Sequence, residues 1–150
     1  MRNLGLAHIS VGERDQSADH LNEGFRLLAE VQSSFNGDPA VLTSLGVVLL
    51  RKNVPEEAAK LFGRAATLEP KDARHRLNLA SALRAAAKPE LAIESLEEAI
   101  SLDPSLEDAY IQLAEIRREA GSPEESKRTL ERYLKFMPQS LSVRRLLNQR

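Results

Sequence analysis

The chain of 150 residues contains no cysteine, and aromatic side chains make up only 4% of it. The absence of cysteine excludes disulfide bonds, thiol catalysis and thiolate zinc sites. Long hydrophobic runs are also absent: the longest aliphatic stretch extends only from Val47 to Leu50, whereas a membrane-spanning helix needs about 20 residues. No apolar signal core follows Met1. We therefore expect a soluble protein and favour a cytoplasmic location.

Neither sign of charge dominates, because 21 lysines and arginines nearly balance 22 aspartates and glutamates. This balance gives no general case for nucleic acid or an anionic membrane as a partner. Bases exceed acids only near the end, where Glu131 is the single acid among Lys127, Arg128, Arg132, Lys135, Arg144, Arg145 and Arg150. A solvated helical face is the simplest explanation, and an acidic partner is the alternative. Nucleic acid is least favoured, because no aromatic residues for base stacking accompany the charge.

The residue types that carry most enzyme chemistry are present but scattered. The histidines His8, His20 and His75 have no partner at metal-ligand spacing. No nucleophile motif is placed on a strained turn, and the glycines form no phosphate-binding loop. The sequence therefore predicts a non-enzymatic protein with no catalytic residue, no cofactor and no metal site.

What the sequence does contain is a repeat of 34 residues that runs without a gap from Pro39 to Pro138. Five columns recur at this period: a leucine with a small residue, a proline, a further small residue, a large apolar residue and a second proline. They are Leu45-Gly46, Leu79-Ala80 and Leu113-Ala114; Pro55, Pro89 and Pro123; Ala58, Ala92 and Ser126; Phe62, Leu96 and Leu130; and Pro70, Pro104 and Pro138. A fixed period in this range is typical of stacked helical repeats.

We predict a single domain over residues 1–150, built as one continuous stack, because each unit of a repeat array contacts only its neighbours. Its predicted parts are a partial, irregular repeat at 1–37, full repeats at 39–72, 73–106 and 107–140, and a capping helix at 141–150. We expect the capping helix to cover the preceding repeat with Leu141, Leu146 and Leu147. The opposite end of the stack would expose Leu4, Leu6 and Ile9.

Each full repeat has the pattern of a helix, a turn and a second helix. Asp38 and Asp72 precede the first helices as candidate N-caps. The second helices begin at the first proline column, with acids directly after it, where the helix dipole is positive. Ser122 and Glu125 have the spacing of a capping box.

The turns and the small residues indicate how each helix pair packs. Asn53 and Gly121 can adopt the left-handed conformation that closes a helix, whereas Ala87 cannot do so cheaply. We therefore expect the turn at Ala87 to differ from the other two. Helices joined by a short turn cross closely only at small side chains, so the first helices should meet the second ones at the small-residue columns. These columns are Gly46, Ala80 and Ala114, facing Ala58, Ala92 and Ser126.

These columns resemble the tetratricopeptide repeat. The repeat that begins at Pro39 has the family's residue at every position, namely Leu42, Leu45, Gly46, Leu49, Ala58, Phe62, Ala65 and Pro70. The later repeats depart from the pattern, which suggests local repacking at Arg76, Arg117, Ser126 and Tyr133. The resemblance implies an all-α, right-handed superhelical solenoid of antiparallel helix pairs.

The same resemblance implies a protein-protein interaction scaffold that binds a peptide or a partner helix in a concave groove lined by the first helices. The candidate groove residues are Val47, Leu50, Arg74, Leu77, Asn78, Ser81, Arg84, Asp108, Ile111, Gln112 and Glu115. Their charge changes from arginines to acids along the groove, so we expect a ligand to bind in one direction. The alternative is a structural spacer or self-associating segment of a larger protein, which contacts other copies through its terminal helices.

Some members of this family bind the C-terminal carboxylate of heat-shock chaperones with a clamp of five side chains. Asn78 matches the middle position of that clamp, but Thr43, Val47, Asp108 and Gln112 occupy the flanking positions. Asp108 would repel a carboxylate at a position that needs a charge-assisted hydrogen bond. We therefore predict no useful affinity for chaperone tail peptides.

Overall fold

The structure is a computed structural model, and it describes residues 19, 22–24, 26–27 and 37–148. The partial repeat predicted at 1–37 lies almost entirely outside the described residues. Leu4, Leu6 and Ile9, which were expected to form one end of the stack, lie outside them as well.

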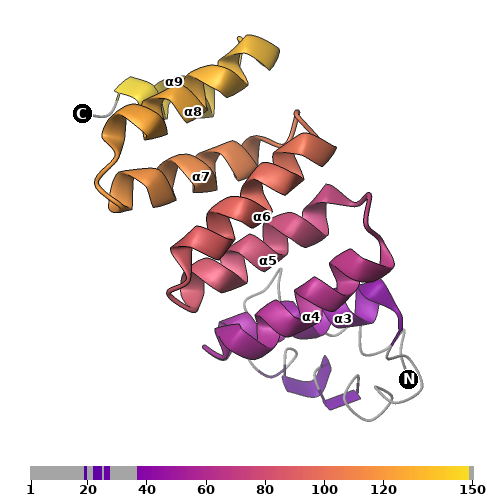
Figure 1. Ribbon diagram of the computed structural model, residues 1–150. Coiled ribbons are helices and arrows are strands. Elements are labelled where there is room, and N and C mark those ends of the chain that lie inside the picture. The colour runs from indigo at the N-terminus through magenta and orange to yellow at the C-terminus, as the bar shows by residue number, and fades with distance from the viewer. Residues whose placement is uncertain (1–18, 20–21, 25, 28–36, 149–150) are drawn as a thin grey trace. The chain divides into compact units, whose positions relative to one another are not determined.

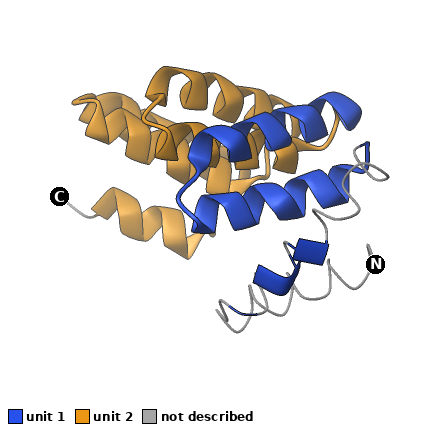
Figure 2. Ribbon diagram, turned by 90° about the horizontal axis from the view of Figure 1, so that it is seen from below, with its two compact units in different colours: residues 1–70 blue, residues 71–150 orange. Residues whose placement is uncertain are grey.

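Every regular element in the described part of the chain is an α-helix (Figure 1). The chain divides into two compact units, residues 1–70 and residues 71–150 (Figure 2). The helices are α3 (Pro39–Arg51) and α4 (Pro55–Leu68) in the first unit, and α5 (Ala73–Ala85), α6 (Pro89–Leu102), α7 (Glu107–Glu119), α8 (Pro123–Phe136) and α9 (Leu141–Asn148) in the second. Within the units α3 packs on α4, α5 on α6 and α7 on α8. None of these helices is long and apolar enough to cross a bilayer.

Two of the predicted N-caps are confirmed. The Asp38 side chain accepts hydrogen bonds from the first backbone N–H groups of α3, and the Asp72 side chain does the same for α5. The predicted capping box of α8 is wrong, because the Ser122 side chain makes no capping hydrogen bond. The backbone N–H of Ser122 already donates to the carbonyl of Arg117 at 2.9 Å, so it is not available to Glu125.

The three turns close in the same way, although a different residue stands in each. Asn53, Ala87 and Gly121 all have positive φ, at 58°, 54° and 78°. In each turn this residue's N–H donates three residues back and the next N–H donates five residues back. The expectation of a different turn at Ala87 is therefore wrong. The shared closure holds Ala87 in the left-handed region, at a cost of about 1–2 kcal/mol for a residue with a Cβ atom.

In the first unit, α3 and α4 meet where a glycine faces an aromatic ring. A Cβ atom at Gly46 would lie 2.7 Å from the ring of Phe62, and that ring is fully buried. The atoms nearest to a Cβ at Gly46 thus belong to Phe62 rather than to Ala58, although Ala58 is also fully buried. The other repeats have alanine in the glycine column and leucine in the phenylalanine column, so a larger residue on the first helix accompanies a smaller one on the second.

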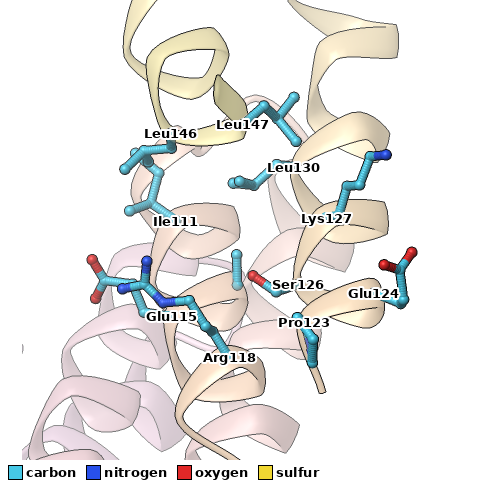
Figure 3. A pocket seen from close by; sticks show the side chains of 11 residues that line it. Ile111, Glu115, Arg118, Pro123, Glu124, Ser126, Lys127, Leu130, Leu146 and Leu147 are labelled. Atoms are coloured by element: carbon cyan, nitrogen blue, oxygen red, sulfur yellow. The ribbon is translucent and has the colours of Figure 1, made fainter. Parts of the chain in front are cut away.

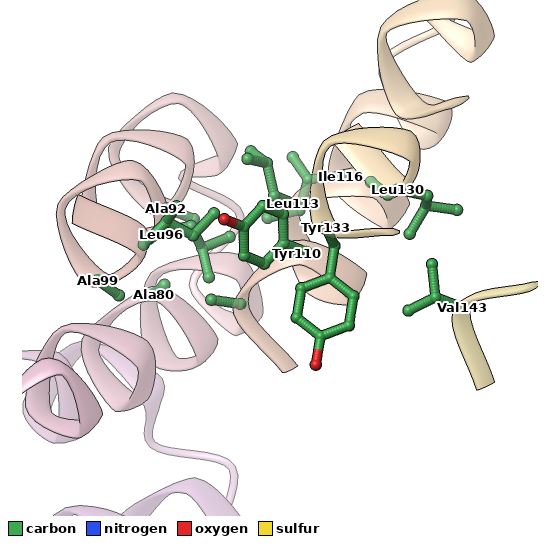
Figure 4. Packing of buried hydrophobic residues seen from close by; sticks show 13 residues of the cluster. Ala80, Ala92, Leu96, Ala99, Tyr110, Leu113, Ile116, Leu130, Tyr133 and Val143 are labelled. Carbon is green, nitrogen blue, oxygen red and sulfur yellow. The ribbon is translucent and has the colours of Figure 1, made fainter. Parts of the chain in front are cut away.

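The core of the second unit has aromatic side chains at its centre (Figure 4). Tyr110 and Tyr133 are buried, and their ring centroids are 5.0 Å apart. The guanidinium of Arg132 lies 5.1 Å from the centroid of Tyr110 and donates to Glu97 at 2.8 Å. A tyrosine where the family has alanine is therefore accommodated by aromatic contact with α7.

Arginines at two positions where the first full repeat has leucine, Leu42 and Leu49, are paired with glutamates of α6. Arg76 forms an ion pair with Glu98 at 2.9 Å. Arg117 donates to Glu97 at 3.0 Å and to the hydroxyl of Thr129 at 2.6 Å. The predicted repacking at these positions is therefore a set of polar contacts that links α6, α7 and α8. We call Glu97, Arg117, Thr129 and Arg132 the polar seam.

Helix α9 packs on α8 at the end of the second unit. Val143 is fully buried against the core, a residue that the sequence pattern did not indicate. Leu146 and Leu147 are half-buried against the same core, as expected. Leu141 differs from the expectation, because 77% of it is exposed.

Hydrogen bonds to Glu107 of α7 hold the start of α9. Its carboxylate accepts from the hydroxyl of Ser140 at 2.8 Å and from that of Ser142. The hydrogen bond from Ser142 is the main cause that lowers the pKa of Glu107, against the opposing effect of burial. The contact thus depends on the ionised carboxylate.

Candidate functional site

The candidate groove residues lie on the first helices of their repeats, in both units. Val47 and Leu50 are half-buried on α3 of the first unit. The other nine lie on α5 and α7 of the second unit, and these two helices pack against each other.

Side chains in the middle of this surface bond to each other across the two helices. The Ser81 hydroxyl donates to Gln112 Oε1 at 3.0 Å. The Arg84 guanidinium donates to Glu115 at 2.6 Å and to Glu119 at 2.6 Å. Chiefly through the hydrogen bond to Glu115, these contacts raise the pKa of Arg84. Arg84 on α5 and the acids Glu115 and Glu119 on α7 face each other. The expected separation of positive and negative charge along the groove is therefore not found at these residues.

Arg74 is engaged at the start of its own helix. The Asp72 carboxylate accepts from the backbone N–H of Arg74 at 2.9 Å and from its guanidinium at 2.6 Å. The side-chain hydrogen bond from Arg74 is the main cause that lowers the pKa of Asp72 to about 2. His75 is buried beside this pair, with Nε2 4.0 Å from Asp72 Oδ2. Although 78% of the Arg74 side chain is exposed, its charge is matched locally.

Four further candidate residues lie on the surface next to these bonded pairs. Leu77 and Ile111 are half-buried and pack against the core, so only part of each side chain is accessible. Asn78 is half-buried and Asp108 is exposed. Within the described part of the chain, neither of these two polar side chains has a hydrogen-bond or ion-pair partner. Within α5 and α7, these four residues therefore offer accessible apolar surface and unpaired polar groups to a ligand.

A cavity of about 370 Å³ opens between α7, α8 and α9 (Figure 3). Two candidate groove residues, Ile111 and Glu115, contribute to its lining. None of the other lining residues was predicted as a site residue; they are Ala114, Arg118, Pro123, Glu124, Ser126, Lys127, Leu130, Leu146 and Leu147. No single repeat column indicates this cavity, because its lining comes from three different helices.

The model of the tetratricopeptide repeat family matches residues 83–149. These residues extend from the end of α5 through α9, with the turn and helix pattern described above. The match covers 67 of the 150 residues, so this part of the chain is similar to the tetratricopeptide repeat family. The resemblance inferred from the repeat columns is thereby confirmed. The repeat at 39–72 lies outside the matched residues, although it has the family's residue at every position.

Solved structures with tetratricopeptide-like folds confirm the all-α fold. MamA (residues 41 to the end) from Desulfovibrio magneticus RS-1 is similar at a TM-score of 0.81 and 16% identity, over 93% of this chain and 75% of that one. The APC/C hetero-tetramer Cut9-Hcn1 is similar at a TM-score of 0.77 and 22% identity, over 97% of this chain and 29% of that one. The first tetratricopeptide repeat of Spaghetti (RPAP3), bound to the HSP90 peptide SRMEEVD, is similar at a TM-score of 0.65 and 23% identity. The similarity covers 74% of this chain and 90% of that one. No curated protein matches the chain significantly.

Proposed function

We propose that this chain is a non-enzymatic scaffold that binds a peptide or partner helix on the inner positions of α5 and α7. The family supports a role in protein interaction. Two similar structures are complexes, one with a peptide and one a hetero-tetramer, although the likeness to them concerns the fold alone. The location of the site rests on the geometry of this chain.

The observation that carries the proposal is the amide of Asn78. The Asn78 side chain is half-buried, its amide is accessible to solvent, and it has no partner among the described residues, whereas the neighbouring Ser81 is bonded to Gln112. A side-chain amide supplies both a donor and an acceptor, which suits the backbone of a bound peptide.

The contacts between α5 and α7 support a particular footprint for the proposed ligand. The bonded groups around Ser81 and Arg84 offer less contact, because a ligand would have to compete with hydrogen bonds as short as 2.6 Å. Contact is therefore expected at Asn78, with Leu77 and Ile111 as apolar anchors and Asp108 as a charged one. An extension of the ligand over Val47 and Leu50 stays a prediction.

The proposal is tested by selecting ligands from a displayed random-peptide library and measuring the affinity of the best ones by calorimetry. Asn78→Ala and Leu77→Ala should each weaken binding, the latter by about 2 kcal/mol if Leu77 is an anchor. Arg128→Ala is a matched control, because Arg128 is exposed on α8 away from this surface. The peptide SRMEEVD should not bind. Unchanged affinity in both test variants would place the ligand elsewhere.

A second candidate function is association through the terminal helices, and one observation favours it. Phe136 is 58% exposed, Met137 48% and Leu141 77%, all at the junction of α8 and α9. Exposed apolar groups that cluster in this way are typical of protein contacts. Light scattering coupled to size exclusion should then show oligomers that Phe136→Ser converts to monomers. A monomer at all concentrations would reject this alternative.

A further inference from the structure

We infer that the surface around Asn78 takes a basic peptide segment, and that a lysine or arginine of this segment pairs with Asp108. This specificity rests on the proposed function, since the ligand binds at the same site. Two observations support it. They are the register in which α5 and α7 face each other, and the charge that this register leaves without a partner.

Helices α5 and α7 face each other in a register that two hydrogen-bonded pairs fix. These pairs are Ser81 with Gln112 and Arg84 with Glu115. In both pairs the α7 residue follows its α5 partner by 31 positions. The same step from Leu77 leads to Asp108, which precedes Gln112 by one helical turn on the same face of α7. The register therefore brings a half-buried apolar side chain of α5 to an exposed carboxylate of α7.

The carboxylate of Asp108 has no ion-pair partner within the described part of the chain. The candidate groove arginines of α5 are already used, Arg74 by Asp72 and Arg84 by two glutamates of α7. Arg118 has no ion-pair partner among the described residues, but it follows Asp108 by ten residues. Ten residues of helix span about 15 Å, which exceeds the Debye length of about 8 Å at physiological salt. A ligand at this end of α7 therefore meets a negative charge.

Asp108 also has no task in holding the fold together. Two acids begin α7, and the first, Glu107, holds the start of α9 through Ser140 and Ser142. Asp108 makes no such contact among the described residues, and α7 begins without a side-chain cap. The helix dipole favours an acid here but does not neutralise it, since the positive end carries only about half an elementary charge. A cation of the ligand would supply the partner that this carboxylate lacks.

Lysine and arginine match this patch with both parts of their side chains. The aliphatic stem can cover Leu77 and Ile111, while the charged head group reaches the carboxylate of Asp108. The amide of Asn78, the residue after Leu77, can bond to the ligand's backbone. An acidic segment would find no cation among these four residues and would be repelled by Asp108. The patch thus selects basic segments over acidic ones.

The test selects ligands from a displayed library of random decapeptides, on the full chain and in parallel on Asp108→Asn. Peptides selected on the parent should contain more lysine and arginine, and fewer acids, than the unselected library. Asp108→Asn keeps the size of the side chain and removes its charge, so this bias should disappear. Glu90→Gln is the matched control, because Glu90 is an exposed acid in the first turn of α6 and lies outside the candidate groove. The bias should persist in this control.

Calorimetry with the best peptide from the parent selection measures the contact itself. Each basic residue of the peptide is replaced in turn by glutamine. At one position this change should weaken binding to the parent by up to about fivefold, the upper range for an exposed ion pair. The same change should leave binding to Asp108→Asn unaltered, and its effect on the parent should shrink at high salt. Circular dichroism checks that the variants fold.

The outcomes separate this specificity from the proposed function. The basic ligand class is overturned if the selected peptides show no basic bias, or if the bias survives in Asp108→Asn. The peptide site itself still stands in that case when Asn78→Ala and Leu77→Ala weaken binding. If both of these variants leave the affinity unchanged, or if no peptide is selected, the proposed function fails and the basic specificity fails with it.

Discussion

The helix pair α3–α4 of the first unit and the pair α7–α8 of the second have the same turn but are packed by different chemistry. In α3–α4 the contact is steric, because the absence of a side chain at Gly46 makes room for the ring of Phe62. In α7–α8 the corresponding residues are Ala114 and Leu130, and Arg117 and Thr129 of the polar seam bond beside them. A repeat geometry can therefore be held either by shape or by hydrogen bonds.

The difference also bears on function. The interior of the pair α3–α4 leaves little room for a ligand, since Ala58 and Phe62 are both fully buried. The pair α7–α8 has a cavity next to Ser126 and an arginine, Arg118, without a partner in the described chain. The second unit thus holds both the surface around Asn78 for which we propose binding and the cavity beside α9. The following predictions test this contrast, from the largest expected effect to the smallest.

Filling the small position of the second helix should discriminate most strongly between the two pairs. Ala58→Leu is expected to destabilise by about 3 kcal/mol, because the site is fully buried and the helices must move apart. Ser126→Leu should cost about 1 kcal/mol, since Ser126 borders the cavity. Chemical denaturation, monitored by the hydrogen exchange of each helix pair, measures the destabilisation in both variants. Equal costs would contradict the contrast.

Removing the centre of the polar seam should destabilise the second unit alone. Glu97→Ala leaves Arg132 without its carboxylate partner and Arg117 with only the longer ion pair to Glu125 at 3.8 Å, and we expect a loss of about 2 kcal/mol. Glu94→Ala is the control, because Glu94 is exposed on the same helix and should change stability by no more than about 0.5 kcal/mol. If the two variants unfold at the same denaturant concentration, the seam contributes nothing.

The steric contact of α3–α4 is tested by a double-mutant cycle. In Gly46→Ala the gain in helix propensity, about 1 kcal/mol, is outweighed by the clash with Phe62, for a net loss of about 1 kcal/mol. Phe62→Leu in the same chain should recover most of the clash, because alanine with leucine is the pair that the later repeats use. Additive effects of the two changes would show that the ring and the glycine do not interact.

The turns allow a matched exchange between repeats. Ala87→Gly should stabilise by about 0.5 kcal/mol, because it relieves the left-handed strain but increases the entropy of the unfolded chain. Gly121→Ala should destabilise by a similar amount for the reverse reason. Thermal denaturation measures both, and changes of the same sign in the two variants would contradict the shared turn conformation.

Acidification should loosen the polar contacts of the second unit before it affects α3–α4. The pKa of Glu107 is lower in the folded than in the unfolded chain. Its contribution is therefore present above the unfolded pKa, about 4.3, and is lost as pH falls through the folded value. Hydrogen exchange of α9 should accelerate in this range in the parent, and Glu107→Gln should show the faster exchange already at neutral pH. Identical pH profiles would reject the role of Glu107.

The sequence predicted the local features because each depends on residues close together in the chain. The Asp38 and Asp72 caps and the start of the second helices at proline follow from hydrogen bonding and backbone geometry within one turn. The failures have the opposite character. At Ser122 and Ala87, a closure that both helices of the pair impose outweighs the local preference of the residue.

By itself the sequence determined that the chain is built from repeated helix pairs, since a period of 34 residues with recurrent prolines and small residues admits little else. Tertiary structure decided which polar groups remain unused. Arg84 is occupied by Glu115 from the next repeat, Arg117 by Glu97 from another helix, and Asn78 and Arg118 by no described residue. Partners of this kind are separated by 20 residues or more in the chain. Their pairing depends on how neighbouring helices face each other, which a pattern within one repeat does not encode.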